Sequence, residues 1–204
     1  LDDRAGPERS LHFWAYNRGK RSVALDHATA AGAATLAKLI DSADILLDAS
    51  SGTVAKALGT TPTELAARYP KLIVARMTPF GDTGPWKDYK SSDLVHLALG
   101  GIMMNCGYDP DPAKHYDTPP VAPQLWHAYH IAGDQMIVGI IAGLIHRLHT
   151  GEGQDLCVAI HEAVSKNTEL DVMSWVMRRA PLFRQTCRHA IENPTHVPSI
   201  GHTK

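Results

Sequence analysis

The chain has 204 residues, of which 44% are hydrophobic and 20% are charged, as is ordinary for a globular domain. With a formal net charge of −1, its charge does not favour nucleic acid or an anionic membrane surface as the main partner. The longest apolar run, 136–145, is well short of the ~20 residues of a membrane span. The three cysteines are odd in number and widely spaced, which favours reduced thiols in a cytoplasmic protein. We therefore expect neither nucleic acid nor membrane among its partners.

Strands and helices are expected to alternate in the first 80 residues. Residues 21–26 (RSVALD) and the apolar run 44–50 (DILLDAS) are predicted strands. Between them, the Ala-rich segment 27–43 keeps apolar residues at helical spacing. A capping box of Thr and Glu opens a helix at 61–69, and 71–78 (KLIVARMT) is the next predicted strand. This order predicts parallel βαβ units with right-handed crossovers, and so an α/β fold.

The loop at 79–86 (PFGDTGPW) follows a predicted strand, at the edge where open α/β sheets place their ligands. The remaining elements are predicted as a helix within 92–106, a long Pro-rich loop at 107–126, a helix at 130–148, a strand at 154–160 and a helix at 161–179. Long loops of this kind are often functional. From residue 181 the pattern indicates a linker, and we expect the chain to be a fragment of a larger fold, because it begins without Met and ends without a final element.

Five segments in a fixed order carry a resemblance to a known family. They are YNRGKRSVALD (16–26), SADILLDASSGTVAKALG (42–59), LAARYPKLIVARMTPFGDTGPW (65–86), SSDLVHLALGG (91–101) and AGDQMIVGIIAGLIHRLHTGEGQDLCVAIHEAV (132–164). Together they resemble the class III CoA-transferases, the family of formyl-CoA transferase and of carnitine and bile-acid CoA-transferases.

The resemblance implies a Rossmann-like large domain with a mostly parallel sheet and flanking helices, a small domain and an interlocked dimer. Residues 1–180 would then be an incomplete large domain that lacks its N-terminal βαβ unit, and 181–204 a linker towards a missing small domain. The expected partners are acyl-CoA, a small carboxylic acid and a second subunit, either a copy of this chain or a homologue. CoA would be a substrate, and no covalently bound cofactor is expected.

The chemistry that the resemblance implies requires a carboxylate. An Asp attacks the acyl-CoA thioester to give a mixed anhydride and a CoA thiolate. The thiolate then attacks the enzyme's own acyl carbon and gives an enzyme–CoA thioester, from which the acceptor acid takes CoA by the reverse steps. His and Tyr have no carbonyl carbon and cannot hold CoA as a thioester.

The position of that Asp is occupied by Tyr129. In the family the Asp lies four residues before a Gly that precedes the long apolar helix, and here that Gly is Gly133. The nearest carboxylate, Asp134, is five residues further along the chain, about a turn and a half of helix. Asp134 is therefore the less favoured substitute for the nucleophile.

The CoA-binding positions are also altered. Where the family often has an Asn-Phe-Arg wall, this chain has Ala and two Ser at 49–51, and a basic position is Ala57. Lys20 and Lys90 keep basic positions that can pair with CoA phosphates as point charges, and Asp93 matches an acidic position near the active site. Each lysine could equally be a solvated surface charge.

The other polar candidates have simpler explanations. His127, His130 and Asp134 have the spacing of metal ligands on one helix face, but a polar helix start is the preferred interpretation. Met103, Met104, Met136 and Trp126 are expected to fill a core rather than line an acyl pocket.

Two other function classes were compared with the sequence, and the first lacks its catalytic pair. The racemase branch of the superfamily needs a His at position 92 and an Asp at 129, where this chain has Ser92 and Tyr129. A non-catalytic role, as a subunit or fused half that pairs with an active homologue, agrees with the missing nucleophile and the reduced CoA contacts. A simple dinucleotide binder fits poorly, because no GxGxxG follows a predicted strand.

Overall fold

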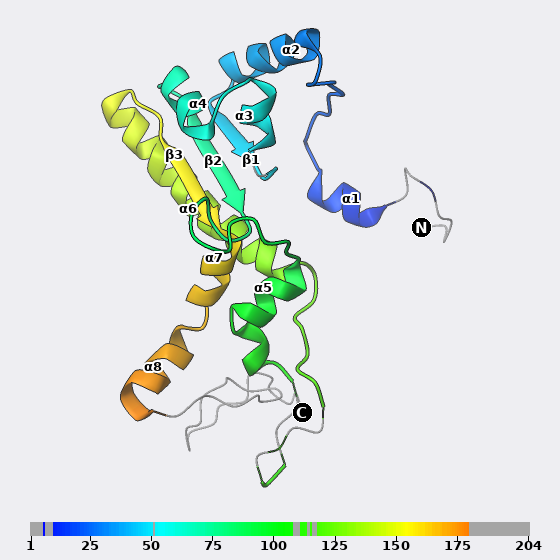
Figure 1. Cartoon of the computed structure of the whole chain (residues 1–204), viewed down its shortest axis with the longest axis vertical. Helices are drawn as coiled ribbons and strands as arrows, with labels where there is room; N and C mark the ends of the chain where they lie inside the picture. The colour runs from blue at the N-terminus through cyan, green and yellow to red at the C-terminus, as the bar shows by residue number, and fades with distance from the viewer. Residues whose placement is uncertain are drawn as a thin grey trace, which may run out of the picture.

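A parallel three-stranded sheet forms the centre of the computed structural model, which describes residues 6, 10–50, 52–107, 111–113, 115 and 118–179 (Figure 1). The strands are β1 (Ile45–Asp48), β2 (Ile73–Thr78) and β3 (Asp155–Ala159), in the order β1-β2-β3. Ile45 lies beside Ile73, and Val74 beside Asp155, both in parallel register. The predicted α/β class and the strands expected at 44–50, 71–78 and 154–160 are confirmed.

Three helices accompany the first two strands: α2 (Ala30–Asp41), α3 (Thr53–Ala57) and α4 (Pro62–Arg68). The capping box at the start of α4 is present, with Thr61 accepting from the backbone N–H of Glu64 and the Glu64 carboxylate accepting from that of Thr61. Ile40 of α2 joins Leu72 and Val74 in a small core beside the sheet.

The long helix α6 (His127–Thr150) runs along the sheet and contacts both β2 and β3. Gly143 and Gly139 lie on the contacting face: a Cβ at Gly143 would lie 3.5 Å from Ile73, and one at Gly139 would lie 3.6 Å from Leu156, both at ordinary van der Waals distance. At the far end of α6, Arg147 donates to the backbone carbonyls of Asp44 and Lys71. The helix is thereby tied to the loops that precede β1 and β2.

The helices α5 (Asp93–Leu99) and α7 (Ile160–Lys166) lie beyond the carboxyl ends of the strands, followed by α8 (Glu169–Arg178) (Figure 1). A second core lies between α5, α6 and α7, and its buried residues are Leu97, Ala128, Ala132, Ile160, Ala163 and Val164. The helix α1 (Leu11–Tyr16) stands apart from the sheet and was not expected from the sequence.

Residues 21–26 do not form the predicted strand. The segment is irregular and Val23 is exposed, because no strand edge in the described part of the chain pairs with it. The helix expected at 161–179 is divided into α7 and α8. At the break, the side chains of Asn167 and Thr168 donate to the carbonyls of Ala163 and Ser165 and compete with the helical hydrogen bonds.

The helix predicted at 130–148 begins one turn earlier, at His127, so that the segment WHAYHIAGDQ lies almost wholly inside it. Within 92–106, α5 ends at Leu99 and a short 3-10 turn (Ile102–Asn105) follows the Gly pair. The linker expected at 181–204 lies outside the described residues, as does part of the loop at 107–126.

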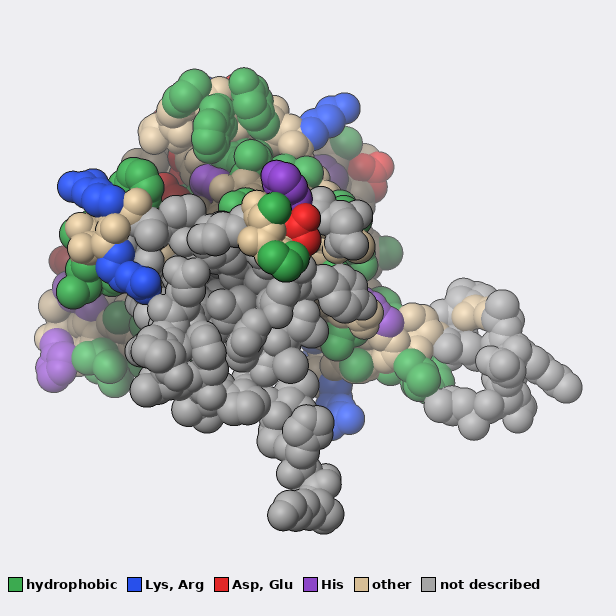
Figure 2. Space-filling model, turned by 90° about the horizontal axis from the view of Figure 1, so that it is seen from below, with side chains coloured by type: hydrophobic (Ala, Val, Ile, Leu, Met, Phe, Trp, Pro, Cys, Tyr) green, Lys and Arg blue, Asp and Glu red, His purple; other side chains and the backbone are tan. Residues whose placement is uncertain are grey.

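Helix α6 is the one helix of the described chain that is long and apolar enough to cross a membrane by length and composition. Core helices pass the same test, and α6 packs one face against the sheet. Its outward stripe of Ile137, Ile141, Ile145 and Leu148 is exposed, and so are several apolar residues of α8. Figure 2 shows the molecule from below, where hydrophobic side chains gather at the top of the view.

Candidate functional site

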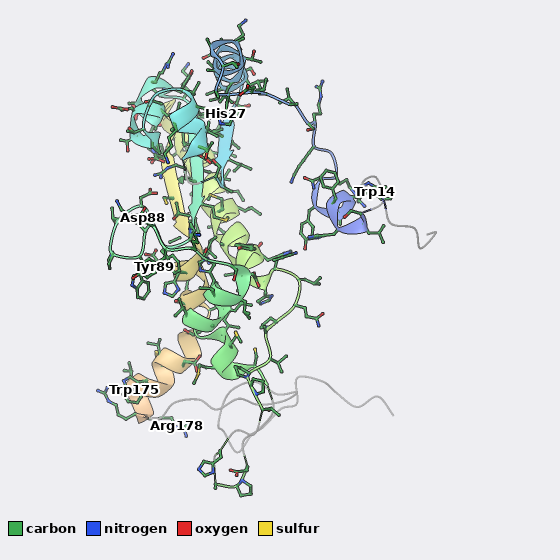
Figure 3. The ribbon with its side chains drawn as sticks, turned by 45° about the vertical axis from the view of Figure 1, so that its right-hand side comes forward. Trp14, His27, Asp88, Tyr89, Trp175 and Arg178 are labelled. Atoms are coloured by element: carbon green, nitrogen blue, oxygen red, sulfur yellow. The ribbon has the colours of Figure 1, made fainter. Side chains whose placement is uncertain are left out.

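A first pocket, the strand-end pocket, lies at the carboxyl ends of β1 and β2, where open α/β sheets bind ligands. It has a volume of about 300 Å³. Its lining residues are Asp48, Gly52, Lys56, Thr60, Thr61, Pro62, Arg76, Met77, Thr78, Pro79, Gly81, Asp82, Lys87 and Asp88. Asp88 lies on the loop that follows β2, next to Tyr89 (Figure 3). The predicted ligand loop at 79–86 thus forms part of a pocket.

Arg76 organises the sheet side of this pocket. Its guanidinium donates to both carboxylate oxygens of Asp155, at 2.9 and 3.1 Å, and also to Asp82. Burial alone would lower the pKa of Arg76, but its hydrogen bonds to Asp155 and Asp82 and their negative charges outweigh burial and raise the pKa. Because its charge is already shared by two carboxylates, the pocket's remaining basic groups are Lys56 and Lys87.

A second pocket, the α6 pocket, lies against the first three turns of α6 and has a volume of about 620 Å³. Its lining residues are His12, Tyr16, Lys20, Trp126, Tyr129, His130, Gly133, Asp134 and Ile137. Helix α1 supplies part of the wall through two hydrogen bonds to α6. The indole N–H of Trp126 donates to Nε2 of His12 at 3.1 Å, and Oη of Tyr16 lies 2.8 Å from Nε2 of His130.

The start of α6 is held by a carboxylate from another helix. Asp93 is only 8% exposed, and its Oδ1 accepts from the backbone N–H of Ala128 at 2.9 Å and of Tyr129 at 3.4 Å. The N-cap residue, Trp126, makes no side-chain cap of its own. Asp93 therefore serves as the cap of α6 and faces its backbone.

The sequence-predicted residues are only partly brought together. Tyr129, Asp134 and Lys20 line the α6 pocket, whereas Lys90 is exposed and lines neither pocket. Asp93 lies behind the start of α6 rather than in the pocket wall. Trp126, expected in a core, is 52% exposed at the pocket.

Gly133 has no close neighbour. An added Cβ would meet no atom within 4 Å, because the position opens onto the α6 pocket. His127 and His130 do not join a metal site: no group of three or more His, Cys, Asp or Glu in the described residues could hold an ion.

A buried histidine, His96, and a half-buried one, His161, lie beside the site. His96 is 0% exposed, and within the described residues neither ring nitrogen has a hydrogen-bond partner; Nδ1 of His161 is likewise unpaired. Both rings pack on Phe80, with centroids 5.1 and 5.6 Å away. Burial lowers the pKa of His96, His161 lowers it further, and Asp93 opposes the shift.

Acid should therefore destabilise the fold through His96. Its folded-state pKa is lowered, so the unfolded chain binds the proton more readily, and stability is fully present above about pH 6.5 and declines below it. We expect a loss of at most ~1.4 kcal/mol per pH unit, measured by urea unfolding. His96→Phe should flatten this decline, whereas His149→Phe, at an exposed position, should not. An unchanged pH profile in His96→Phe would contradict the assignment.

Comparison with known proteins decides the family. The model of the family described as CoA-transferase family III matches residues 2–197. The chain belongs to CoA-transferase family III. A formyl-CoA:oxalate CoA-transferase of Streptomyces avermitilis is 32% identical over 155 residues, which are 76% of this chain and 36% of that protein. The succinyl-CoA:(R)-benzylsuccinate CoA-transferase subunit BbsE of Thauera aromatica is 33% identical over 171 residues, 83% of this chain and 40% of that protein.

Solved structures agree with this family III assignment. A CAIB/BAIF family protein from Brucella suis has a TM-score of 0.73 and 26% identity, over 82% of this chain and 42% of that one. The protein Rv3272 from Mycobacterium tuberculosis has a TM-score of 0.66 and 28% identity, over 79% of this chain and 45% of that one. The chain thus spans less than half the length of these family III relatives.

Several residues of the two pockets were not found from the sequence. Lys56 lines the strand-end pocket one residue before Ala57, the position where we noted the loss of a basic group. The sequence itself shows this basic residue one position before Ala57, so Lys56 could have been proposed from the sequence. His12 and Tyr16 reach the α6 pocket from more than 100 residues away, and no local pattern indicated that contact.

Proposed function

We propose that this chain takes part in moving CoA between an acyl-CoA thioester and a carboxylic acid, as a subunit or half that does not itself supply the nucleophile. The observation that carries the proposal is Tyr129, which lines the α6 pocket at the position where the resemblance places the family's Asp. A phenol can hydrogen-bond a substrate but has no acyl carbon on which CoA could be held.

A partner fits the exposed surface of the chain. The apolar stripe on α6 is half or more exposed at each position, up to 84% at Leu148. A contiguous apolar surface of this kind favours burial against more protein. The relative from Thauera aromatica is itself named as a subunit. We infer an interlocked dimer in which a homologous chain with the catalytic Asp is the other member, and a homodimer is the alternative.

The two pockets suggest where the parts of an acyl-CoA would bind. The strand-end pocket, with Lys56 and Lys87, suits the phosphates of CoA, since lysines act there as point charges. The α6 pocket, with its more apolar wall of rings, suits the acyl group or the acid. Family membership and the position of both pockets support this division.

A second candidate gives this chain its own catalytic activity. Asp134 lines the same pocket as Tyr129 and is the one carboxylate among the lining residues of that pocket. It is exposed, and it could attack a thioester that lay further along α6. Because Asp134 and Tyr129 line one pocket, the two candidates need a direct test.

Mapping of covalent adducts distinguishes a chain without a nucleophile from one in which Asp134 is the nucleophile. The protein is incubated with an acyl-CoA, trapped with hydroxylamine or borohydride and digested for mass spectrometry, with an active family member as the positive control. We expect no adduct on this chain, because the residue at the nucleophile position has no carboxylate. A hydroxamate or reduced product on Asp134, absent in Asp134→Asn, would overturn the proposal in favour of an autonomous transferase.

The family positions of Lys20 and Lys90 make a rival prediction to the one based on the lysines of the strand-end pocket, namely that Lys20 and Lys90 hold the CoA phosphates. On that rival prediction, replacing both with Ala should weaken CoA binding roughly threefold to tenfold at low salt, and the difference should shrink as salt screens the charges. Calorimetry at two ionic strengths measures this. The matched control is Lys38→Ala with Lys166→Ala, two exposed lysines outside both pockets. Equal affinities for the two double variants would identify Lys20 and Lys90 as ordinary surface charges.

A further inference from the structure

The wall of the α6 pocket consists largely of rings. Five of its nine lining residues carry an aromatic or imidazole ring: His12, Tyr16, Trp126, Tyr129 and His130. The rings of Trp126 and Tyr129 have centroids 6.2 Å apart and are tilted by only 33°, so their faces have similar directions. Ile137 extends the apolar surface along α6.

Four of the five rings are joined in pairs through one polar atom each. Trp126 donates to His12, and Tyr16 shares a hydrogen bond with His130. These four atoms are therefore engaged within the wall and do not recognise a polar ligand. What they leave for a ligand is the faces of the rings, which attract flat aromatic groups.

The backbone that positions Trp126 at the start of α6 is strained. Leu125 and Trp126 have φ values of +65° and +56°, a left-handed conformation that bulky residues rarely adopt. Trp126 also occupies the N-cap, where a short polar side chain would stabilise the helix, and Asp93 supplies the cap instead. Strain of this kind clusters at ligand sites, and here its result is an indole at the pocket.

Space for a ligand ring is provided by Gly133. A Cβ there would meet nothing within 4 Å, so bare helix backbone faces the pocket between the rings and Ile137. A cation is also present: Lys20 lines the pocket, and its ammonium has a long contact of 3.4 Å to Asn17. Asp134 lines the pocket as well and disfavours a ligand with more than one negative charge near it.

We propose that the α6 pocket binds a monocarboxylic acid that carries a planar aromatic ring, with the ring against Trp126 and Tyr129 and the carboxylate at Lys20. The inference rests on the proposed function, because it names the class of acid that the chain handles. An aliphatic acid of the same size would fill the same volume of about 620 Å³ but would gain no contact between ring faces.

Two acids of matched shape test the proposal. Phenylpropanoate and cyclohexylpropanoate have the same chain and charge, but only the first has a flat aromatic ring. Titration of the whole chain, followed by NMR or calorimetry, should give about threefold to tenfold tighter binding of phenylpropanoate. Equal affinities, tighter binding of the saturated acid, or no binding of either would overturn the proposal.

Variants locate the binding. Trp126→Leu should abolish the preference for the aromatic acid, and Gly133→Leu should block both acids by filling the space that no protein atom occupies. Trp175→Leu is the matched control, because Trp175 is exposed on α8, and α8 lies far from α1 in both views (Figures 1 and 3). A preference that survives Trp126→Leu, or binding that survives Gly133→Leu, would exclude the α6 pocket.

CoA itself is titrated in parallel, so that the two proposals fail separately. If CoA binds but the two acids bind equally, the aromatic specificity is wrong and the proposed function stands. If phenylpropanoate is preferred and CoA does not bind, the pocket is assigned correctly and the CoA-transfer role is wrong. Displacement of phenylpropanoate from wild type by adenosine would show that the rings hold a nucleotide base, which also overturns the proposal.

Discussion

Replacing Asp93 with Ala is expected to destabilise the chain by roughly 2–3 kcal/mol and to loosen the first turn of α6. The carboxylate is 8% exposed and accepts two backbone N–H groups, from Ala128 and Tyr129. Its loss would leave both donors at the end of a 24-residue helix without a partner. Urea unfolding measures the cost, and hydrogen exchange at the two amides measures the local opening.

Two controls separate the charge from the hydrogen bonds. Asp93→Asn keeps an acceptor oxygen and should cost less, about 1 kcal/mol, because the amide oxygen still accepts but without a charge. Asp134→Asn removes an exposed carboxylate of α6 itself and should cost less than ~0.5 kcal/mol. If Asp93→Ala were as mild as Asp134→Asn, the start of α6 would be held by its core contacts and not by Asp93.

The role of Asp93 changes how its position in the sequence is understood. From the family pattern it was expected near CoA, and its site role remains a prediction. In the structure Asp93 has a definite mechanical role, because it fixes the backbone that carries Tyr129. A residue at position 129 can thus be exchanged without moving the helix, since the cap comes from α5 and not from the exchanged side chain.

Local signals predicted most of the fold. Thr61, Pro62 and Glu64 gave the start of α4 correctly, since a capping box acts within one turn. The strand predicted at 21–26 failed, because strand formation needs a partner edge that a local pattern cannot supply. The division of α7 from α8 depends on side-chain hydrogen bonds of Asn167 and Thr168 that a periodicity of apolar residues does not detect.

The family segment at 132–164 contains residues that are explained by folding rather than by catalysis. Gly151 ends α6 with φ +79°, a conformation that favours glycine, and a Cβ at Gly153 would lie 2.0 Å from the carbonyl oxygen of Leu72. Arg147 ties the same end of the helix to Asp44. These residues are needed by any chain that folds this way, so the family could be recognised from them without reference to the catalytic position.

The candidate site could be predicted only where it depends on spacing along α6. The spacing from Gly133 pointed to position 129, and in the structure Tyr129 and Asp134 line the α6 pocket together. The ring wall was not foreseen, because His12 and Tyr16 come from α1 and meet α6 across 114 residues of sequence. Contacts of that range are decided by packing and leave no periodic trace.

Tyr129→Asp is expected to convert the chain from one that forms no acyl or CoA adduct to one that does. The new carboxylate would lie in the α6 pocket in the first turn of α6, where the helix dipole favours a negative charge. It could attack the thioester carbonyl, breaking the carbon–sulfur bond and releasing CoA thiolate. Attack of that thiolate on the Asp acyl carbon would then release the donor acid and leave CoA on the protein as a thioester.

The decisive comparison is with Tyr129→Asn, which has the same shape as the Asp variant but no carboxylate to attack the thioester. After incubation with an acyl-CoA and trapping with borohydride or hydroxylamine, we expect a product at residue 129 in Tyr129→Asp and none in Tyr129→Asn or the wild type. Asp93 should be kept in all three, because its carboxylate holds the amide of residue 129 and thereby aims the new side chain. If Tyr129→Asp were as inert as Tyr129→Asn, while still folded and able to bind CoA, the wall of rings and not the missing carboxylate would be what prevents the covalent step in this chain.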